Sequence, residues 1–401
     1  MIDKICQIEE CTGCRACEQV CPVKCIKMLS DEFGQLKASV TDKCIECGKC
    51  IKTCPNNSKI EFKTPIRCYA GWSTDDNIRF SSASGGIAAT IYRYCISHNI
   101  KTFGCVITPD GYCHYKEIKT DADIKECQNS KYVFSDTESI YTKIRQALIS
   151  GENVIFIGLP CQVAGLYRFL NRAYDNLTTI DLVCHGVAPA QYLKQHIETI
   201  SGKHLVNYIS FREPVAQTHT YQFHLSDHSR KWHYRKYVYD NDTYQVGFHK
   251  SLIYRDNCYE CKYARLRRIS DLTISDFSGL GRLAPWDKSK INVSCILLNS
   301  NRGENLLTAL GDTVALYERP LNEALNFEHQ LKAPSTPHSR RSVFLDTYSK
   351  THDFDKAVKK AAGKQLRIFH LKKVMHIMEI KRLVVRLFPS RLKCYIKSVL
   401  R

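Results

Sequence analysis

Two cysteine runs close to the N-terminus constrain this chain more than any other feature. The run from Cys11 to Pro22 and the run from Cys44 to Pro55 share the spacing C-x2-C-x2-C-x3-C-P. This spacing is typical of 4Fe-4S clusters, in which the fourth cysteine of each run binds the cluster of the other run. The predicted ligands of one cluster are Cys11, Cys14, Cys17 and Cys54, and those of the other are Cys44, Cys47, Cys50 and Cys21.

Zinc and disulfides are the competing explanations for these cysteines. Zinc modules usually pair two C-x2-C knuckles across a spacer, so the duplicated longer run favours iron-sulfur. The chain has 21 cysteines in 401 residues and begins without the charged and apolar segments of a signal peptide. We therefore expect a cytoplasmic protein whose thiols stay reduced and available to metals. No apolar stretch approaches the roughly 18 residues that a membrane-spanning helix needs.

The positive charge of the chain is concentrated near its C-terminus. The formal net charge is +18, and residues 356–401 contain 14 Lys or Arg and one acid, which gives +13 there and +5 elsewhere. Apolar residues follow helical spacing on both sides of Pro389, at Leu371, Val374, Met375 and Met378 and then at Leu392, Tyr395, Ile396 and Val399. The pattern predicts two basic amphipathic helices.

Two interpretations of this tail stay open. The helices either bind an anionic surface, such as the inner face of the membrane or an acidic partner, or pack their apolar stripe onto the body of the protein. Nucleic acid is disfavoured because the sequence contains no recognition module.

The middle of the chain has two features that suggest ligand binding. A small-residue loop, residues 81–86, leads into an apolar helix from Ile87 to Tyr94, where backbone amides can approach a phosphate or a flavin. Buried strands at residues 153–158 and 178–183 are followed by Cys161 and Cys184. Since ligands bind beyond the carboxyl ends of strands in open α/β sheets, these two cysteines can converge with the C-x2-C pair at Cys258 and Cys261. A simple turn and ordinary buried thiols are the alternatives.

The order of S-x-S-G-G, G-x-P-C-Q, L-V-C-H-G and C-x2-C-K-Y-A-R, ending in a strand with Asp-Phe, resembles the coenzyme F420 hydrogenase/dehydrogenase β-subunit family. The similarity extends from residue 1 to about residue 300, and the fused ferredoxin resembles versions of the same family. The resemblance implies an iron-sulfur flavoprotein carrying FAD beside a third 4Fe-4S cluster. The implied ligands of that cluster are Cys161, Cys184, Cys258 and Cys261, and the implied flavin-side residues are Ser82, Ser84, Gly85, Gly86, Gly158 and His185.

The substrate is where the resemblance is weakest. After the C-x2-C pair the family often has a G-D-F-W-G-like ending, whereas residues 275–279 read Ser-Asp-Phe-Ser-Gly. Deazaflavin is therefore not carried over as the acceptor, and similar bacterial proteins look like accessory genes of surface-polysaccharide synthesis. A cationic group follows the C-x2-C pair, the knuckle, at Cys258 and Cys261. It either binds an acidic substrate or forms a solvated helix face; its members are Lys262, Arg265, Arg267 and Arg268.

These patterns predict an α+β ferredoxin-like domain, an α/β flavin-binding body and a basic helical tail. The expected boundaries are 1–65 for the ferredoxin, 66–190 and 191–345 for the two parts of the body, and 346–401 for the tail. The expected function is electron transfer between the ferredoxin clusters, a third cluster and FAD to an unidentified acceptor, with no catalytic residue assigned. An electron-transfer subunit that docks to a partner enzyme is the alternative, and a zinc-binding protein is a third, more distant class.

Overall fold

The computed structural model describes residues 5–214 and 221–375. The second predicted tail helix, residues 392–399, and Met378 lie outside the described residues. The helices are α1 (Ala16–Val20), α2 (Lys49–Thr53), α3 (Asp76–Ser81), α4 (Ile87–Ser97), α5 (Asp121–Cys127), α6 (Ile140–Ile149), α7 (Pro160–Leu170), α8 (Ala190–Ser201), α9 (Thr243–His249), α10 (Asp256–Tyr259), α11 (Asn301–Leu310), α12 (Leu321–Phe327), α13 (Arg341–Thr351) and α14 (Phe354–Val374).

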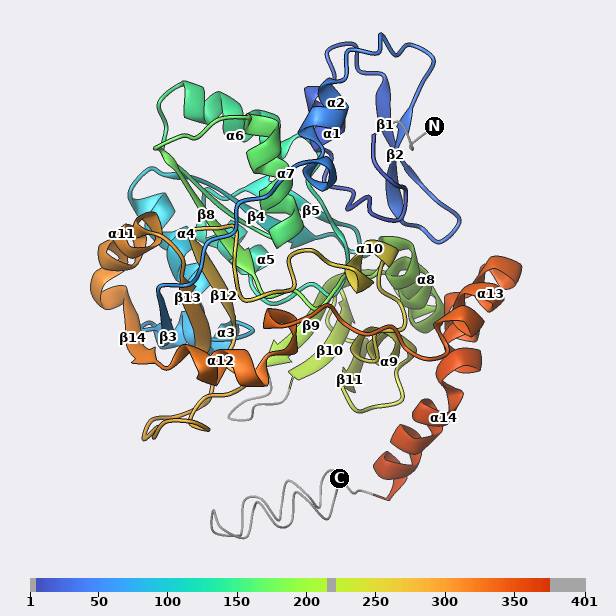
Figure 1. The fold of residues 1–401 in the computed structure, drawn as a ribbon. Coiled ribbons are helices and arrows are strands. Elements are labelled where there is room, and N and C mark those ends of the chain that lie inside the picture. Colours follow the sequence, from blue (N-terminus) through green and yellow to red (C-terminus); the bar gives the residue numbers. More distant parts are fainter. Residues whose placement is uncertain (1–4, 215–220, 376–401) are drawn as a thin grey trace.

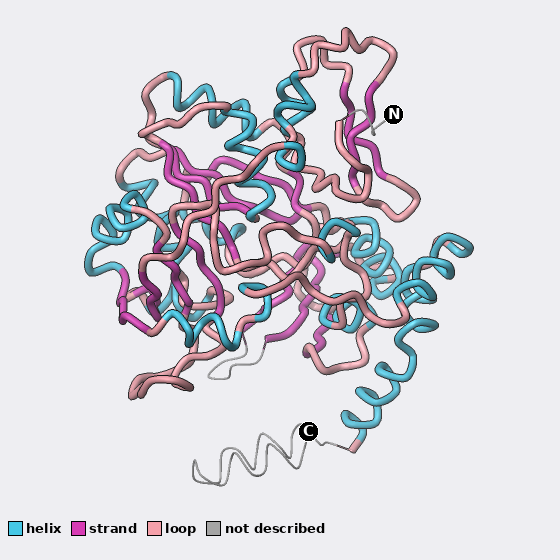
Figure 2. The backbone as a smooth tube through the Cα atoms, in the orientation of Figure 1, coloured by secondary structure: helices cyan, strands magenta, loops and turns pink. Residues whose placement is uncertain are grey.

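Strands form three sheets, the largest of which lies in the middle of the body with helices around it (Figure 2). The strands are β1 (Ile26–Ser30), β2 (Leu36–Val40), β3 (Arg67–Ser73), β4 (Lys101–Ile107), β5 (Cys113–Glu117), β6 (Ser135–Asp136), β7 (Val154–Gly158), β8 (Leu177–Leu182), β9 (Val206–Pro214), β10 (Tyr221–Asp227), β11 (His233–Tyr237), β12 (Leu272–Asp276), β13 (Ser294–Leu298) and β14 (Val314–Arg319). The buried strands predicted at residues 153–158 and 178–183 correspond to β7 and β8, and the helix predicted from Ile87 corresponds to α4.

The large sheet has the strand order β14-β3-β13-β12-β8-β7-β4-β5-β6. Its centre, from β12 through β8 and β7 to β4, is parallel, and both flanks contain antiparallel pairs. The α/β body expected from the sequence is confirmed at this level. Because β3 and β14 pair with each other from distant parts of the chain, strands from both predicted parts of the body share one sheet.

A second layer consists of the antiparallel sheet β11-β10-β9 packed with α8, α9, α13 and α14. Its core is rich in aromatic rings, among them Tyr192, Phe223, Tyr244 and Phe354. Much of the dense Tyr and His content after residue 192 therefore packs a core.

The N-terminal segment stands beside the body, with α1 and α2 next to α7 (Figure 1). Its two strands pair as an antiparallel hairpin between the two cysteine runs.

The first half of α14 packs onto the body, whereas its last turn does not. Residues from Phe354 to Leu366 contribute buried side chains to the aromatic core, but Leu371, Val374 and Met375 are exposed. Thus packing onto the body accounts for the beginning of the tail. Among the described residues, no helix combines the length and apolarity needed to cross a membrane.

A buried histidine joins α14 to the small sheet. His196 of α8 contacts Asp242 through Nε2 and Asp355 through Nδ1, both at 2.9 Å, and its side chain is almost fully buried. Burial alone would lower the pKa of His196, but the charge of Asp242 and the hydrogen bonds to both carboxylates raise it to about 9. The imidazolium therefore holds three elements together.

We predict that this contact makes stability depend on pH in a defined window. Because the folded pKa lies above the ordinary value of 6.5, the stabilisation is complete below pH 6.5 and is lost as the pH rises through about 9. The full effect is roughly 3 kcal/mol by linkage. Thermal unfolding of wild type and His196→Gln, followed anaerobically by circular dichroism, should differ most at pH 6 and least above pH 9. A constant difference across this range would contradict the prediction.

Candidate functional site

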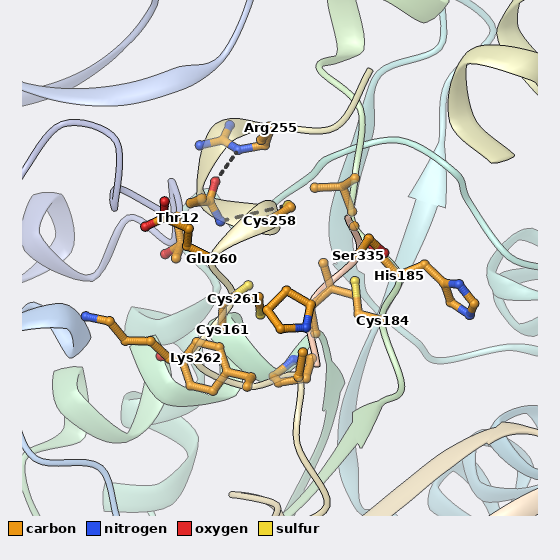
Figure 3. A pocket seen from close by; sticks show the side chains of 18 of the residues that line it. Thr12, Cys161, Cys184, His185, Arg255, Cys258, Glu260, Cys261, Lys262 and Ser335 are labelled. Carbon is orange, nitrogen blue, oxygen red and sulfur yellow. Dashed lines mark hydrogen bonds between the residues drawn. The ribbon is translucent and has the colours of Figure 1, made fainter. Parts of the chain in front are cut away.

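A cavity of about 250 Å³ lies where the N-terminal segment meets the body. Its wall contains the four later cysteines that the sequence singled out, which we call the cavity set: Cys161, Cys184, Cys258 and Cys261. Figure 3 shows these side chains around one space. Glu9, Glu10, Thr12 and Asn56 of the N-terminal segment line the same cavity.

Neighbouring parallel strands bring the first two of these cysteines together. Gly158 at the end of β7 pairs with Asp181 of β8, so both strands end at the same edge of the sheet. Pro160 begins α7 at a position where its missing N–H is harmless, and Cys161 follows in the first turn. Cys184 lies two residues beyond β8, and α10 with the turn after it supplies Cys258 and Cys261.

The cavity set supplies four thiols, the ligand type that both zinc sites and 4Fe-4S clusters use. Among the described residues, no group of three or more His, Cys, Asp or Glu side chains is placed to hold one ion. A cubane needs a wider arrangement because each thiolate binds a different iron. Burial raises the pKa of all four thiols, that of Cys258 to about 11, so binding of a metal cluster would have to displace their protons.

The eight ferredoxin cysteines fall into two sets that differ in exposure. The proximal set is buried and consists of Cys11, Cys14, Cys17 and Cys54. The distal set consists of Cys21, Cys44, Cys47 and Cys50, of which Cys47 is exposed and the others are partly buried. The distal set surrounds a smaller cavity of about 20 Å³ with Val23, Ile45 and Lys49 at its edge.

The proximal set is pressed against the body through α7. Cys14 belongs to the same core as residues of α6, α7 and β7. A Cβ added to Gly165 would lie 2.9 Å from the Sγ atom of Cys14 and 2.9 Å from the hydroxyl of Tyr141. The Thr137 hydroxyl donates a 2.9 Å hydrogen bond to the carbonyl of Cys14, which fixes this turn to the loop after β6.

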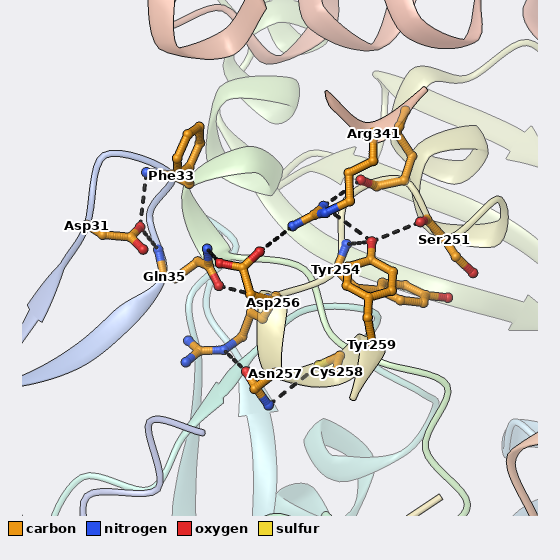
Figure 4. Close-up of polar contacts among 12 residues, drawn as sticks. Asp31, Phe33, Gln35, Ser251, Tyr254, Asp256, Asn257, Cys258, Tyr259 and Arg341 are labelled. Carbon is orange, nitrogen blue, oxygen red and sulfur yellow. Dashed lines mark hydrogen bonds and ion pairs between the residues drawn. The ribbon is translucent and has the colours of Figure 1, made fainter. Parts of the chain in front are cut away.

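Helix α10 is the second point of contact between the N-terminal segment and the body. Asp256 and Gln35 exchange two hydrogen bonds, at 2.7 and 3.0 Å, and Asp256 also pairs with Arg341 of α13 at 2.6 Å (Figure 4). Arg255 donates from Nη2 to the carbonyls of Cys11 and Leu36, at 3.1 and 3.0 Å. The same short helix carries Cys258, so it ties a cavity cysteine to a proximal one.

Two family models match the parts of the chain on either side of this junction. Residues 10–58 match a 4Fe-4S dicluster domain, and residues 151–324 match the model described as the C terminus of the coenzyme F420 hydrogenase/dehydrogenase beta subunit. Over residues 151–324 the chain is therefore similar to this beta-subunit family. No curated protein matches the chain.

Among solved structures, a chain of the xenon-derivatised F420-reducing NiFe hydrogenase complex from Methanosarcina barkeri is similar to this chain. The two are 16% identical, the match covers 77% of this chain and 94% of that chain, and the TM-score is 0.42.

The loop expected to line a flavin makes its contacts within the chain itself. The hydroxyls of Ser82 and Ser84 donate to the carbonyls of Ile78 and Val293, at 2.7 and 3.1 Å. A Cβ on Gly85 would lie 2.4 Å from the carbonyl oxygen of Gly71, and Gly86 packs against Ile78 in the same way. These four residues do not line the cavity of the four cysteines. The two glycines therefore allow this loop to pack closely against β3 and α3.

The other two residues expected near a flavin lie in different surroundings. Gly158 ends β7 against the ring of Phe156 and does not line the cavity. His185 does line it, is half exposed, and has its Nε2 atom 3.7 Å from Oε1 of Glu328.

The cationic group after the knuckle matches neither of its two sequence interpretations well. Arg268 is buried and pairs with Asp181 at 3.0 Å, and Arg265 lies over the ring of Phe62, 4.6 Å from its centroid. Arg267 donates to the carbonyl of Phe62, and Lys262, at the cavity edge, pairs with Glu10 at 3.4 Å. The group mainly fastens the N-terminal segment and the linker to the body.

Sequence reasoning missed Arg255, Tyr263, Cys6 and Cys25. Arg255 and Tyr263 line the cavity, and their positions directly beside the C-x2-C pair were the available signal. The Sγ atoms of Cys25 and Cys21 are 3.4 Å apart. Cys6 hydrogen-bonds Cys11 and Cys54, which raises its pKa. Each ferredoxin set thus has one additional thiol next to it.

We predict that Gly165→Ala disturbs the proximal set selectively. The new methyl group has to displace Cys14 or Tyr141, and overpacking of this kind costs about 1–3 kcal/mol. The expected result is a lower iron content and a changed proximal electron paramagnetic resonance signal in protein purified without oxygen. Gly363→Ala in α14, where a Cβ meets nothing within 4 Å, is the matched control and should load normally. Equal iron in both variants would show that this close approach is unimportant.

Proposed function

We propose that this chain is an iron-sulfur oxidoreductase that carries electrons between a partner protein at the distal set and an acceptor at the cavity. The observation that supports it is the order of the three cysteine sets. The distal set reaches solvent at Cys47, the proximal set is buried against α7, and the cavity set begins on that same helix at Cys161.

The donor chemistry of the three sets is consistent with this proposal. Each consists of four cysteines, the ligand type of 4Fe-4S clusters, which transfer one electron at a time. The surrounding residues have separate tasks. Helix α7 carries Cys161 and packs against Cys14, and the burial of Cys14 limits its contact with water, which tunes a cluster's potential.

The proposal includes one FAD, because the family resemblance implies it and because two-electron reduction of an organic acceptor needs a group that can hold two electrons. We assign no step to it, since residues 82–86 make their contacts within the chain. The acceptor is an organic molecule of unidentified class, and a role in surface-polysaccharide synthesis is part of the proposal. Without flavin, the chain would be a relay subunit for a partner enzyme.

Metal and flavin content of protein purified without oxygen tests this proposal. We expect about 12 irons, three clusters of four, and one released flavin per chain. Cys184→Ser should lose about four irons and keep both ferredoxin signals. Cys95→Ser, which removes a buried thiol from α4 away from the cavity, is the control and should keep all iron.

About 8 irons in the wild type, unchanged by Cys184→Ser, would refute the third cluster. A colourless protein containing zinc would refute the iron-sulfur assignment as a whole.

We further propose that the exposed end of α14 binds an anionic membrane surface. Leu371, Val374 and Met375 are exposed and are accompanied by Lys364, Arg367 and Lys372 on the same helix. Apolar side chains flanked by cations are typical of helices that lie in a lipid interface.

Sedimentation with vesicles tests this membrane contact. The full chain should sediment with vesicles rich in phosphatidylglycerol, less so at high salt, and not with phosphatidylcholine alone. A variant lacking residues 368–401 should stay in the supernatant, and it retains the buried part of α14 up to Leu366. Unchanged sedimentation of this variant would exclude the tail as the anchor.

A further inference from the structure

Two polar atoms in side chains that line the cavity have no hydrogen-bond partner among the described residues. They are Nη1 of Arg255 and the hydroxyl of Tyr263. Arg255 is 1% exposed and Tyr263 is 3% exposed. Buried polar groups are almost always paired, because an unpaired one loses its water without compensation. Each side chain therefore keeps a donor that an acceptor bound beside it would satisfy.

Arg255 is a buried cation with no carboxylate partner among the residues that the structure describes. Its Nη2 atom donates to the carbonyls of Cys11 and Leu36, its Nε atom donates to Asn257 at 3.3 Å, and its guanidinium lies 4.5 Å from the ring centroid of Phe134. These partners are all neutral. A fully buried arginine is rare unless an anion compensates it, so the missing anion is the main clue to its role.

The position of Arg255 relates it to two cysteine sets at once. It touches the backbone of Cys11 in the proximal set, and its own carbonyl accepts a 3.0 Å hydrogen bond from the amide of Cys258 in the cavity set. Figure 3 shows Arg255 and Cys258 on the same short helix at the cavity wall. Thiolate-ligated iron-sulfur clusters are anionic and gain a further negative charge on reduction, which makes them suitable counterions.

Tyr263 also lies between these two sets. Its ring belongs to the same core as Cys14, against which Cys161 and Cys261 pack. Its backbone carbonyl accepts a 3.0 Å hydrogen bond from Arg268, which fixes the main chain at this point. The hydroxyl is thus held in a dry region surrounded by cysteines of both sets.

We propose that Arg255 and Tyr263 are positioning residues that set the reduction potentials of the proximal and cavity iron-sulfur sites. The guanidinium supplies a positive charge that both sites share, and the Tyr263 hydroxyl donates a hydrogen bond to a cluster sulfur. The cavity part of this inference rests on the third cluster of the proposed function, whereas the proximal part needs only the 4Fe-4S dicluster domain.

The direction of the effect follows from electrostatics. A nearby cation and a hydrogen bond to sulfur both stabilise the reduced, more negative form of a cluster, so both raise its potential. Removing either should shift the affected sites to more negative potential. The distal set lies around a separate cavity that contains neither residue, so it serves as a reference within the same molecule.

A purely structural role would give a different pattern. If Arg255 only joined α10 to the N-terminal segment, its loss would lower stability or iron content without moving the potentials of two sites relative to the third. Arg255→Lys separates the roles further, because it keeps the charge and loses the fork of hydrogen bonds.

The test is a redox titration followed by electron paramagnetic resonance on the full chain, with iron counted on the same samples. Arg255→Gln should shift the proximal and cavity signals to more negative potential and leave the distal signal in place. Arg255→Lys should stay close to wild type. Tyr263→Phe should shift the cavity signal in the same direction, and Tyr92→Phe, equally buried in a separate core, should shift none.

Unchanged potentials in Arg255→Gln and Tyr263→Phe, or equal shifts of all three signals, would overturn the inference. If Arg255→Gln does not load its clusters, Tyr263→Phe and Arg255→Lys decide the question. In that case, unchanged proximal and cavity signals in Tyr263→Phe would contradict the inference. A wild type with about 8 irons would remove the third cluster of the proposed function. The proximal signal of Arg255→Gln would then still test the role of the arginine.

Discussion

The close packing of the proximal cysteine turn against α7 is the contact on which the site depends. Gly165 lets Cys14 approach the helix, and the first turn of that helix carries Cys161. Since the two cysteines are held by one rigid element, their separation does not depend on the linker near residue 66. A larger residue at position 165 would have to displace Cys14 or Tyr141.

Much of the body could be predicted from local sequence pattern. The strands β7 and β13 are short runs that are buried throughout, and β8 is mostly buried; such runs can be recognised without knowing their neighbours. Placement of Cys161 and Cys184 at one edge follows from the parallel arrangement of the strands that precede them. The cysteine spacing of the ferredoxin needs no tertiary information at all, and the dicluster match agrees with it.

What local pattern could not supply are contacts between distant parts of the chain. Arg255 meets Cys11 across 244 positions, and β14 pairs with β3 although the rest of the body lies between them in sequence. The cations after the knuckle looked like a solvated face because their partners, Phe62 and Glu10, belong to a different segment. The small-residue loop at Gly85 suggested a ligand, whereas the group that closely approaches Gly85 in the structure is the backbone of β3. A glycine in the sequence indicates that another group can approach its backbone closely, but the sequence does not identify that group.

The electrostatics of the junction follow from the same contacts. A buried guanidinium without a carboxylate is unstable as an isolated feature, and it becomes reasonable only when anions occupy the space that it faces. If clusters occupy both cysteine sets, as we propose, one fixed cation raises both potentials, whereas negative charge added at one cluster repels charge at the other. Coupling of this kind is reciprocal. An electron on the proximal side would therefore disfavour a second one on the cavity side until the first has moved on, which separates single electrons along the path without any movement of the protein.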